Sequence, residues 1–525
     1  MTAADLLAAC LEREGVEYVF GVPGEENEDL LFSLRDSEVE FVQVRHEQGG
    51  AFMADVWGRV TGEAGVCLST LGPGATNLLT GVADAHLDKS PLVAVTGQGG
   101  LERLHHESHQ AIDVVDTFES VTKWNVQLND PDIVHEAVRK AFKLSQREKP
   151  GATHLELPED VAAEETDREP LDDAERTPGS RPSPEALATC ESLLAEAERP
   201  LVLVGNGAVR TEAYAELRRL VEATDLPVVS TYMGKGAVDD SDPRSLMTVK
   251  SGDDGQARTA VERADLVVAV GYDIAEHDPD EWLADPETPI VHVDSEGAEV
   301  YEDYQPEVEI VADVERTTRE LTDRVEDFSF DDGWYADLRA EIQASVDVDA
   351  AAEAPFSVEG VLPLLREAMA PEDVLVSDVG SHKMTIAENF PTHEPNTCIV
   401  SNGFASMGIA VPGGIAADLA VDGNVVAATG DCGFLMNAAE LETATRLDCG
   451  YSVVVFTDDD YGLISEKQEA SRGEHFGTEL TNPDFEAFAR SFGIEAYRPR
   501  TRAELREALA TVDDDEITLV EVPVS

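Results

Sequence analysis

Short apolar runs alternate with segments of helical periodicity throughout residues 1–165. The runs VEYVFGVPG, GVCLS and SPLVAVTGQ are typical of buried strands, and a Gly-Pro-Gly turn and a helix separate the last two. Strand, helix and strand in this order predict parallel strands joined by crossover helices. The first helix is predicted to start after Thr2, which can cap it, and its apolar side carries Leu6, Leu7, Cys10 and Leu11.

The same alternation of apolar runs and helical segments occurs in residues 187–325 and again in residues 357–525. Buried-strand runs include PLVLVGNGAV and ADLVVAVGYD in the middle stretch, and NVVAATG and YSVVVF in the last. A charged, Pro-rich segment at 165–186 is predicted to be a linker, and an acidic segment at 325–355 leads into the last stretch. The pattern predicts an α/β protein of three domains, 1–165, 187–325 and 357–525, each a doubly wound parallel sheet.

The first and third domains share a further pattern. In each, a Gly-containing turn, at Gly72-Pro73-Gly74 or at Gly430–Gly433, precedes a helix and then a buried strand. One ancestral sheet used twice would explain this repetition. A chance likeness between two α/β units is the alternative.

The chain is strongly acidic. Its 525 residues include 107 Asp and Glu against 38 Lys and Arg, a net charge of −69 at pH 7. A field of this sign repels phosphate, so nucleic acid is excluded as a partner. Because the acids are spread along the whole chain, we expect a surface adapted to concentrated salt, as in halophiles, or an ordinary solvated acidic surface.

Other features of the sequence indicate the cellular compartment of the protein. No run approaches the roughly 18 apolar residues of a membrane span, so no membrane is expected as a partner. The N-terminal residues lack the basic lead of a signal peptide. The six cysteines form no C-x-x-C pair, which favours buried, reduced thiols. Together these features predict a cytoplasmic protein.

The stretch AATGDCGFLMNAAELE, residues 427–442, is the strongest candidate for chemistry. A predicted strand runs into Gly430, and the helix after it can receive a phosphate at its first N–H groups. Asp431 beside them suits Mg²⁺, which prefers carboxylate and phosphate oxygens. A second carboxylate is expected where the next strand ends, and Asp458 stands there. An acidic surface loop is the alternative in so acidic a chain.

These residues, GDCGF followed by FTDDDYG, resemble the diphosphate–magnesium motif of thiamine-diphosphate-dependent enzymes. The resemblance covers nearly the whole chain. RHEQGGAFMADVWGRV is similar to the family's pyrimidine-binding domain, and SDVGSHKMTIAENF and SNGFASMGIAVPGGIAA are similar to its diphosphate-binding domain. Within that superfamily the sequence resembles acetolactate synthase, particularly the catabolic, FAD-independent branch, in segments such as SHQAIDVVDTFESVTKWNV.

The resemblance implies roles for individual residues. Glu47, in RHEQ, matches the catalytic glutamate that would hydrogen-bond the aminopyrimidine ring of thiamine diphosphate (ThDP), and Gln110 and His109 match substrate-side residues. Asp431, Asp458 and the backbone carbonyl of Asp460 match the Mg²⁺ ligands. Cofactor contacts are implied for Asn77, Ser381, His382, Met407, Gly430, Gly433 and Phe434.

The resemblance also implies an activity. Pyruvate would be decarboxylated on ThDP and its hydroxyethyl group transferred to a second 2-oxo acid, giving 2-acetolactate. The site would close between subunits of a homodimer or homotetramer, with Glu47 from one chain and the Mg²⁺ ligands from another. No FAD is expected, because GYDIAEHD replaces the Arg-Phe-Asp-Asp-Arg segment of FAD-containing members. Cys432 departs from the family's Gly, which puts the affinity for diphosphate in question.

Two other functions fit the same motifs. The first is another ThDP-dependent 2-oxo-acid decarboxylase or acyl transferase, and aldehyde as the main product would identify the decarboxylase. The second is a non-catalytic ThDP-binding homologue. Glu47 favours catalysis over binding alone, because a binding protein needs no acid to activate the cofactor. Whether a regulatory subunit binds is left open by the sequence.

Overall fold

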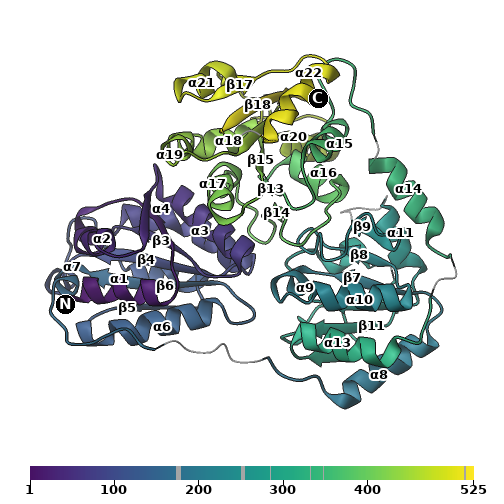
Figure 1. Ribbon diagram of the computed structural model, residues 1–525, viewed down its shortest axis with the longest axis horizontal. Helices are drawn as coiled ribbons and strands as arrows, with labels where there is room; N and C mark the ends of the chain where they lie inside the picture. The colour runs from purple at the N-terminus through teal and green to yellow at the C-terminus, as the bar shows by residue number, and fades with distance from the viewer. Residues whose placement is uncertain (173–178, 250–254, 284, 331–332, 347, 514–515) are drawn as a thin grey trace.

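The computed structural model describes residues 1–172, 179–249, 255–283, 285–330, 333–346, 348–513 and 516–525. They form three lobes, each built on a six-stranded sheet (Figure 1). Neighbouring strands within each sheet run parallel, and separate apolar clusters cover the two faces of each sheet. The prediction of three doubly wound α/β sheets is therefore confirmed.

The N-terminal lobe has the strand order β2-β1-β3-β4-β6-β5. Its strands are β1 (Tyr18–Gly21), β2 (Glu40–Gln43), β3 (Gly65–Ser69), β4 (Leu92–Gln98), β5 (Trp124–Gln127) and β6 (Ala152–Pro158). Its helices are α1 (Ala3–Arg13), α2 (Glu28–Arg35), α3 (Glu47–Thr61), α4 (Pro73–Leu87), α5 (Val114–Phe118), α6 (Val134–Ser145) and α7 (Glu159–Ala162). Thr2 caps α1 as predicted, with its hydroxyl accepting from the Asp5 N–H.

The central lobe has the order β12-β11-β10-β7-β8-β9. Its strands are β7 (Pro200–Val204), β8 (Val228–Ser230), β9 (Ser245–Thr248), β10 (Leu266–Val270), β11 (Ile290–Asp294) and β12 (Val308–Val311). Its helices are α8 (Pro184–Glu196), α9 (Asn206–Arg210), α10 (Tyr214–Thr224), α11 (Gln256–Arg263), α12 (Pro279–Trp282), α13 (Val314–Val325) and α14 (Ala336–Val346).

The C-terminal lobe has the order β14-β13-β15-β16-β18-β17. Its strands are β13 (Val374–Ser377), β14 (Cys398–Val400), β15 (Val425–Gly430), β16 (Ser452–Thr457), β17 (Glu495–Tyr497) and β18 (Thr518–Pro523). Its helices are α15 (Val358–Ala368), α16 (Ser381–Asn389), α17 (Ala410–Ala420), α18 (Asp431–Asn437), α19 (Glu440–Arg446), α20 (Gly462–Arg472), α21 (Phe485–Ser491) and α22 (Arg502–Leu509). Counted along the chain, this order equals that of the N-terminal lobe, which supports the predicted repetition.

Some elements differ from the expectation. The acidic segment at 325–355 contains α14, whose Leu338, Ile342 and Val346 are buried at helical spacing. The helix expected after the Gly-Asp turn is two short helices, α18 and α19, and α18 already begins at Asp431. Part of the predicted 165–186 linker, residues 173–178, lies outside the described residues.

Helices α3 and α17 join the N-terminal and C-terminal lobes through one shared apolar cluster. A Cβ at Gly413 in α17 would lie 2.8 Å from a methyl of Val56 in α3, so the absence of a side chain lets the helices approach closely. Beside this contact Arg59 is buried against three carboxylates, those of Asp55, Asp84 and Asp88. The Arg59 guanidinium also donates to the Val400 carbonyl, 2.9 Å away in the other lobe.

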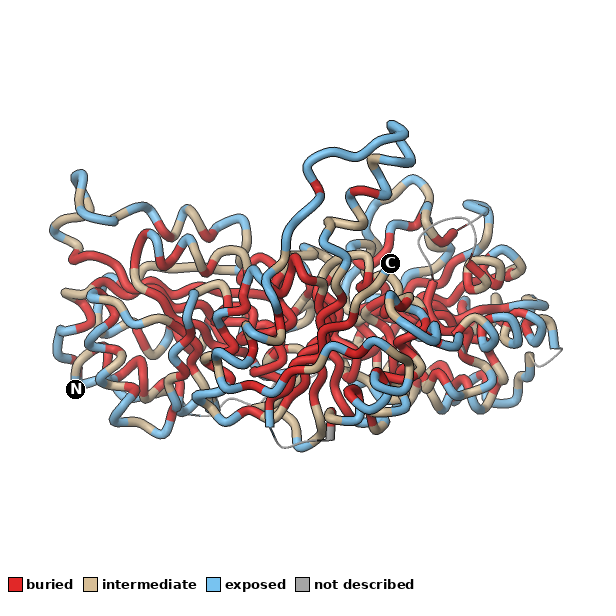
Figure 2. The backbone as a smooth tube through the Cα atoms, turned by 90° about the horizontal axis from the view of Figure 1, so that it is seen from above, coloured by how far each residue is buried: buried red, intermediate tan, exposed pale blue. Residues whose placement is uncertain are grey.

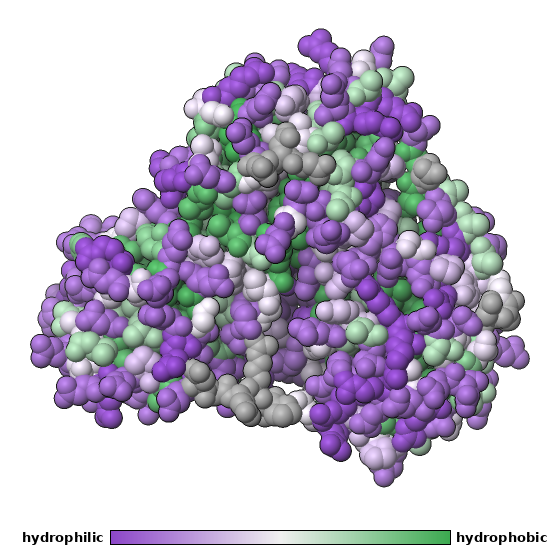
Figure 3. Space-filling model, viewed as in Figure 1, coloured by the Kyte–Doolittle hydropathy of each residue, from purple (hydrophilic) through white to green (hydrophobic). Residues whose placement is uncertain are grey.

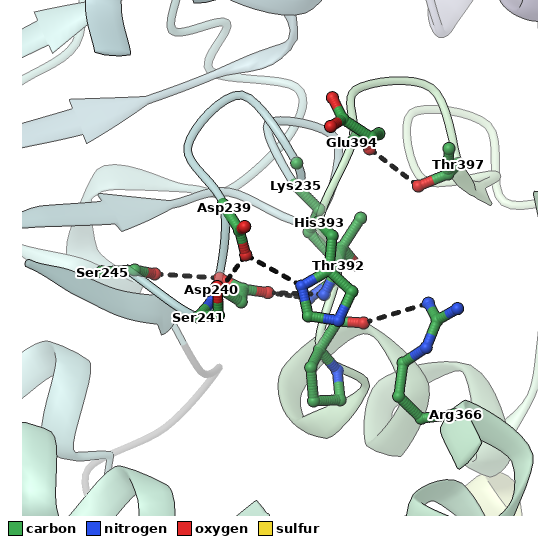
Figure 4. A network of polar contacts seen from close by, with 12 residues as sticks. Lys235, Asp239, Asp240, Ser241, Ser245, Arg366, Thr392, His393, Glu394 and Thr397 are labelled. Carbon is green, nitrogen blue, oxygen red and sulfur yellow. Dashed lines mark hydrogen bonds and ion pairs between the residues drawn. The ribbon is translucent and has the colours of Figure 1, made fainter. Parts of the chain in front are cut away.

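The central lobe is attached to the C-terminal lobe through the segment that follows α16 (Figure 4). The Thr392 N–H donates to Asp240 at 2.9 Å, and the Asp240 N–H donates back to the Thr392 carbonyl at 3.0 Å. His393 Nδ1 lies 2.8 Å from Asp239, and the Arg366 guanidinium donates to the Pro391 carbonyl. This network fixes the C-terminal end of α16, whose first residues belong to the candidate site.

Buried residues run through the middle of all three lobes, and exposed residues surround them (Figure 2). The face shown in Figure 3 is mainly hydrophilic, as the acidic composition requires. All six cysteines are buried and free, which confirms the expected thiols. Within the described ranges, none of the helices combines the length and the apolar character that crossing a membrane would need.

Candidate active site

Asp431 lies where β15 ends and α18 begins, at the carboxyl edge of the C-terminal sheet. Its side chain is almost fully buried. One carboxylate oxygen accepts from the Cys432 N–H at 2.8 Å, and the other accepts from the Asp459 N–H at 2.9 Å and the Asn482 amide at 2.6 Å. These bonds tie the start of α18 to the loop that follows β16.

Asp458 and Asp460 stand in that loop, as expected from the pairing of β15 with β16. Partial burial raises the pKa of Asp458 to about 6, and the negative charges of Asp431 and Asp460 act in the same direction. Two carboxylates and the Asp460 carbonyl thus meet at one sheet edge. No group of three or more His, Cys, Asp and Glu side chains placed to hold a metal ion was found among the described residues. The expected ligand set has only two such side chains.

Cys432 fits the turn without strain. It is the second residue of α18, in a right-handed helical position where a side chain meets no conformational penalty. Its thiol contacts the Asp460 carbonyl at 3.3 Å, and burial together with Asp431 raises the thiol pKa far above its usual range. The protonated thiol therefore helps to hold the Asp460 carbonyl in place.

Ser381 and His382 begin α16, directly after β13, and so lie at the same edge. Burial lowers the pKa of His382 to about 4, so its ring is neutral near pH 7. Its Nε2 is buried and has no hydrogen-bond partner within the described part of the chain. A Cβ at Gly430 would come within 3.3 Å of this ring, and one at Gly462 would come within 3.1 Å of Asp458. The glycines thus keep space open between these side chains.

Asp378 organises the segment that carries Met407, and the sequence did not identify it as a site residue. It is fully buried and accepts from the N–H groups of Gly408 at 2.8 Å and Ala410 at 3.2 Å. Burial raises the pKa of Asp378 to about 6 against the opposing effect of these bonds. Gly433 is needed beside it, because a Cβ there would lie 2.8 Å from the Asp378 carboxylate.

Phe434 is placed differently from the other expected cofactor residues. Its ring is fully buried and packs edge-on against Phe485, with ring centroids 5.3 Å apart. The side chain is therefore part of the core, and its contribution to a ligand site is limited to the backbone.

Glu47 forms a second group, in the N-terminal lobe. It is the first residue of α3, and its carboxylate accepts from the Asn77 amide at 2.9 Å. His109 and Gln110 are exposed in the segment before α5, with Gln110 at a φ of 57°. Glu47 thus lies in the N-terminal lobe, whereas Asp431 and Asp458 lie in the C-terminal lobe.

The sequence matches a known family in three segments. Residues 1–117 match the N-terminal TPP binding domain of the thiamine pyrophosphate enzymes, residues 187–321 match their central domain, and residues 378–522 match their C-terminal TPP binding domain. The chain belongs to the thiamine pyrophosphate enzyme family.

Curated relatives indicate which kind of thiamine pyrophosphate enzyme the chain resembles. A probable acetolactate synthase large subunit from Methanocaldococcus jannaschii is 33% identical over 97% of this chain and 89% of that protein. An acetolactate synthase from Bacillus subtilis is 31% identical over 99% and 93%, and a catabolic acetolactate synthase from Raoultella terrigena is 32% identical over 99% and 94%. The chain is thus an acetolactate synthase-like, ThDP-dependent enzyme.

Proposed function

We propose that this enzyme is an acetolactate synthase, which decarboxylates pyruvate and transfers the hydroxyethyl group to a second 2-oxo acid to give 2-acetolactate. The observation that carries the proposal is the pair of half-sites: Glu47 held by Asn77 in residues 1–165, and the Asp431–Asp458 edge in residues 357–525. The relatives with this name match the chain over nearly its whole length.

The C-terminal half-site fits Mg²⁺ and a diphosphate. Mg²⁺ takes oxygen ligands, and Asp431, Asp458 and the Asp460 carbonyl supply three. Ser381 and the unpartnered Nε2 of His382 are polar groups left for the diphosphate, beside Gly430 and Gly433. Met407 directly precedes Gly408, whose N–H is bound by Asp378, and it would support the cofactor between its two rings.

The N-terminal half-site would exchange a proton with the cofactor. Bound ThDP would supply a nucleophilic carbon and an electron sink for the electron pair that CO₂ leaves behind. Glu47 would exchange a proton with the aminopyrimidine ring, and the hydrogen bond that the Asn77 amide donates fixes the direction of its carboxylate. His109 and Gln110 stand on the exposed side, where substrate would enter.

We propose that the two halves come from two copies of the chain, as the family resemblance implies. Phe404, Leu435 and Met436 are large apolar residues that lie exposed at 45%, 41% and 46% near the Met407 segment. A second copy would cover them and add its own Glu47 to this edge. We therefore propose a homodimer or homotetramer, without FAD.

The product of pyruvate turnover tests the proposal. Purified protein in molar KCl with ThDP, Mg²⁺ and pyruvate should form acetolactate, measured as acetoin after acid treatment. Acetaldehyde as the main product would instead indicate a decarboxylase, and ThDP binding with pyruvate unchanged would indicate a non-catalytic homologue or another substrate.

A further inference from the structure

A buried carboxylate from the C-terminal lobe holds the backbone directly before Glu47. Glu440, the first residue of α19, is fully buried. Its two oxygens accept from the Arg45 N–H at 3.1 and 3.2 Å, and one of them also accepts from the His46 N–H at 3.0 Å. The Thr443 hydroxyl donates to the other oxygen at 2.6 Å.

The rest of α19 closes around the same segment. The Arg446 guanidinium donates to the carbonyl of Gln43, the last residue of β2. A Cβ at Gly49 would lie 2.7 Å from the Glu440 carboxylate, so α3 meets Glu440 without a side chain between them. The connection from β2 to α3 therefore has little freedom to move.

Glu47 is consequently fixed at two points. Asn77 binds its carboxylate, and Glu440 binds the two peptide groups that lead into it. A carboxylate suits the second task because it only accepts hydrogen bonds, whereas an amide would place an N–H₂ group against a donor. Since Glu440 is enclosed by these donors, it acts on Glu47 and not on a ligand.

We propose that Glu440 is a positioning residue that sets the backbone of Glu47 for proton exchange with the bound cofactor. The inference rests on the proposed function, because it assumes that Glu47 performs this exchange. Proton transfer is sensitive to displacements well below 1 Å, so a loosened β2–α3 connection slows it. The stretch from Asp431 to Arg446 thereby carries the Mg²⁺ edge at one end and the support of Glu47 at the other.

The test compares E440Q with E486Q in the full-length protein. Glu486 lies on α21 of the same lobe and pairs with Arg490 at 3.0 Å, so E486Q removes one negative charge without touching the β2–α3 connection and is the control. Two rates are measured: amide hydrogen exchange of the peptide 43–48, and exchange of the C2 proton of bound ThDP with D₂O. E440Q should speed the first and slow the second by about ten- to a hundredfold, with the dissociation constant of ThDP nearly unchanged. E486Q should leave both rates as in the wild type.

Two further variants make the result decisive. T443V removes one bond to the Glu440 carboxylate, and it should shift both rates in the same direction by less, so it serves if E440Q does not fold. E47Q should slow C2 exchange. If E47Q slows it and E440Q does not, the positioning role is wrong and the proposed function stands. If E47Q leaves C2 exchange unchanged, the proposed function itself is wrong.

Discussion

Individual buried carboxylates hold together segments of this protein that lie far apart in the sequence. Asp378, Asp431 and Glu440 each accept two or more N–H donors, and each draws together segments that lie far apart in the sequence. Hydrogen bonds to a charged acceptor are stronger than neutral ones, and losing one inside the protein leaves a donor without a partner. These carboxylates therefore fix the backbone around the candidate site.

His154 gives a prediction for the pH dependence of stability. The His154 ring, in β6, is fully buried and stacks on the ring of Phe118 with the two centroids 4.3 Å apart. Burial lowers the pKa of His154 to about 3. The folded protein keeps this ring neutral, whereas the unfolded chain takes up a proton below about pH 6.5. The unfolding free energy should therefore fall as the pH decreases from about 6.5 toward 3, by at most about 1.4 kcal/mol per pH unit from this group.

Urea unfolding at fixed salt between pH 6 and 4.5 measures that slope. The variant H154Q lacks the titrating ring, so its unfolding free energy should depend less steeply on pH than that of the wild type, by the contribution of one proton. The variant H106Q, changed at an exposed position, should keep the wild-type pH dependence. Equal slopes in wild type and H154Q would show that His154 is not a buried neutral group.

Elements far apart in the chain are joined by buried charge. Arg59 on α3 contacts Asp55 at 2.9 Å on its own helix and Asp88 at 2.6 Å after α4, and it reaches Val400 at the end of β14. The side chains of Asp55, Asp84 and Asp88 are fully buried, and the Arg59 guanidinium pairs with all three.

Replacing Arg59 by Met should accordingly destabilise the protein strongly. The change leaves buried carboxylates without a counter-charge, for which the expected loss is about 3–5 kcal/mol of unfolding free energy. R35M is the control, because the Arg35–Asp36 pair is exposed and its loss should not shift the urea midpoint. A midpoint for R59M equal to that of R35M would contradict the role of Arg59.

The central strands were largely predictable, because strands buried on both faces are continuous apolar runs. Strands at or near the sheet edges, β9 and β12 among them, were not predicted: SLMT is short and partly polar, and VEIV alternates between buried and exposed residues at a sheet edge. Asp431 and Asp458 were predictable because they follow strands, and His382 because its segment resembles the family's diphosphate-binding domain. Glu440 was not, because its partners Arg45 and His46 lie almost 400 residues away and leave no local pattern.

The whole molecule carries a net charge of −69, which opposes compactness at low ionic strength. The screening length falls from about 10 Å at 0.1 M salt to about 3 Å at 1 M. We predict that the thermal midpoint rises markedly between 0.1 and 2 M KCl, and that osmotically matched sucrose does not reproduce the rise. An unchanged midpoint would favour an acidic surface without adaptation to salt.

We propose that Glu47 of one copy and Asp431 of another copy form one carboligase site. The most direct test co-expresses E47Q and D431N chains with different tags and measures acetolactate formation by the purified mixed dimers. Each variant alone should be nearly inactive. With random pairing, half of the dimers are mixed and each of these has one intact site of two, so an unseparated mixture should recover about a quarter of wild-type activity. Mixed dimers as inactive as the parent variants would contradict a site shared between two chains.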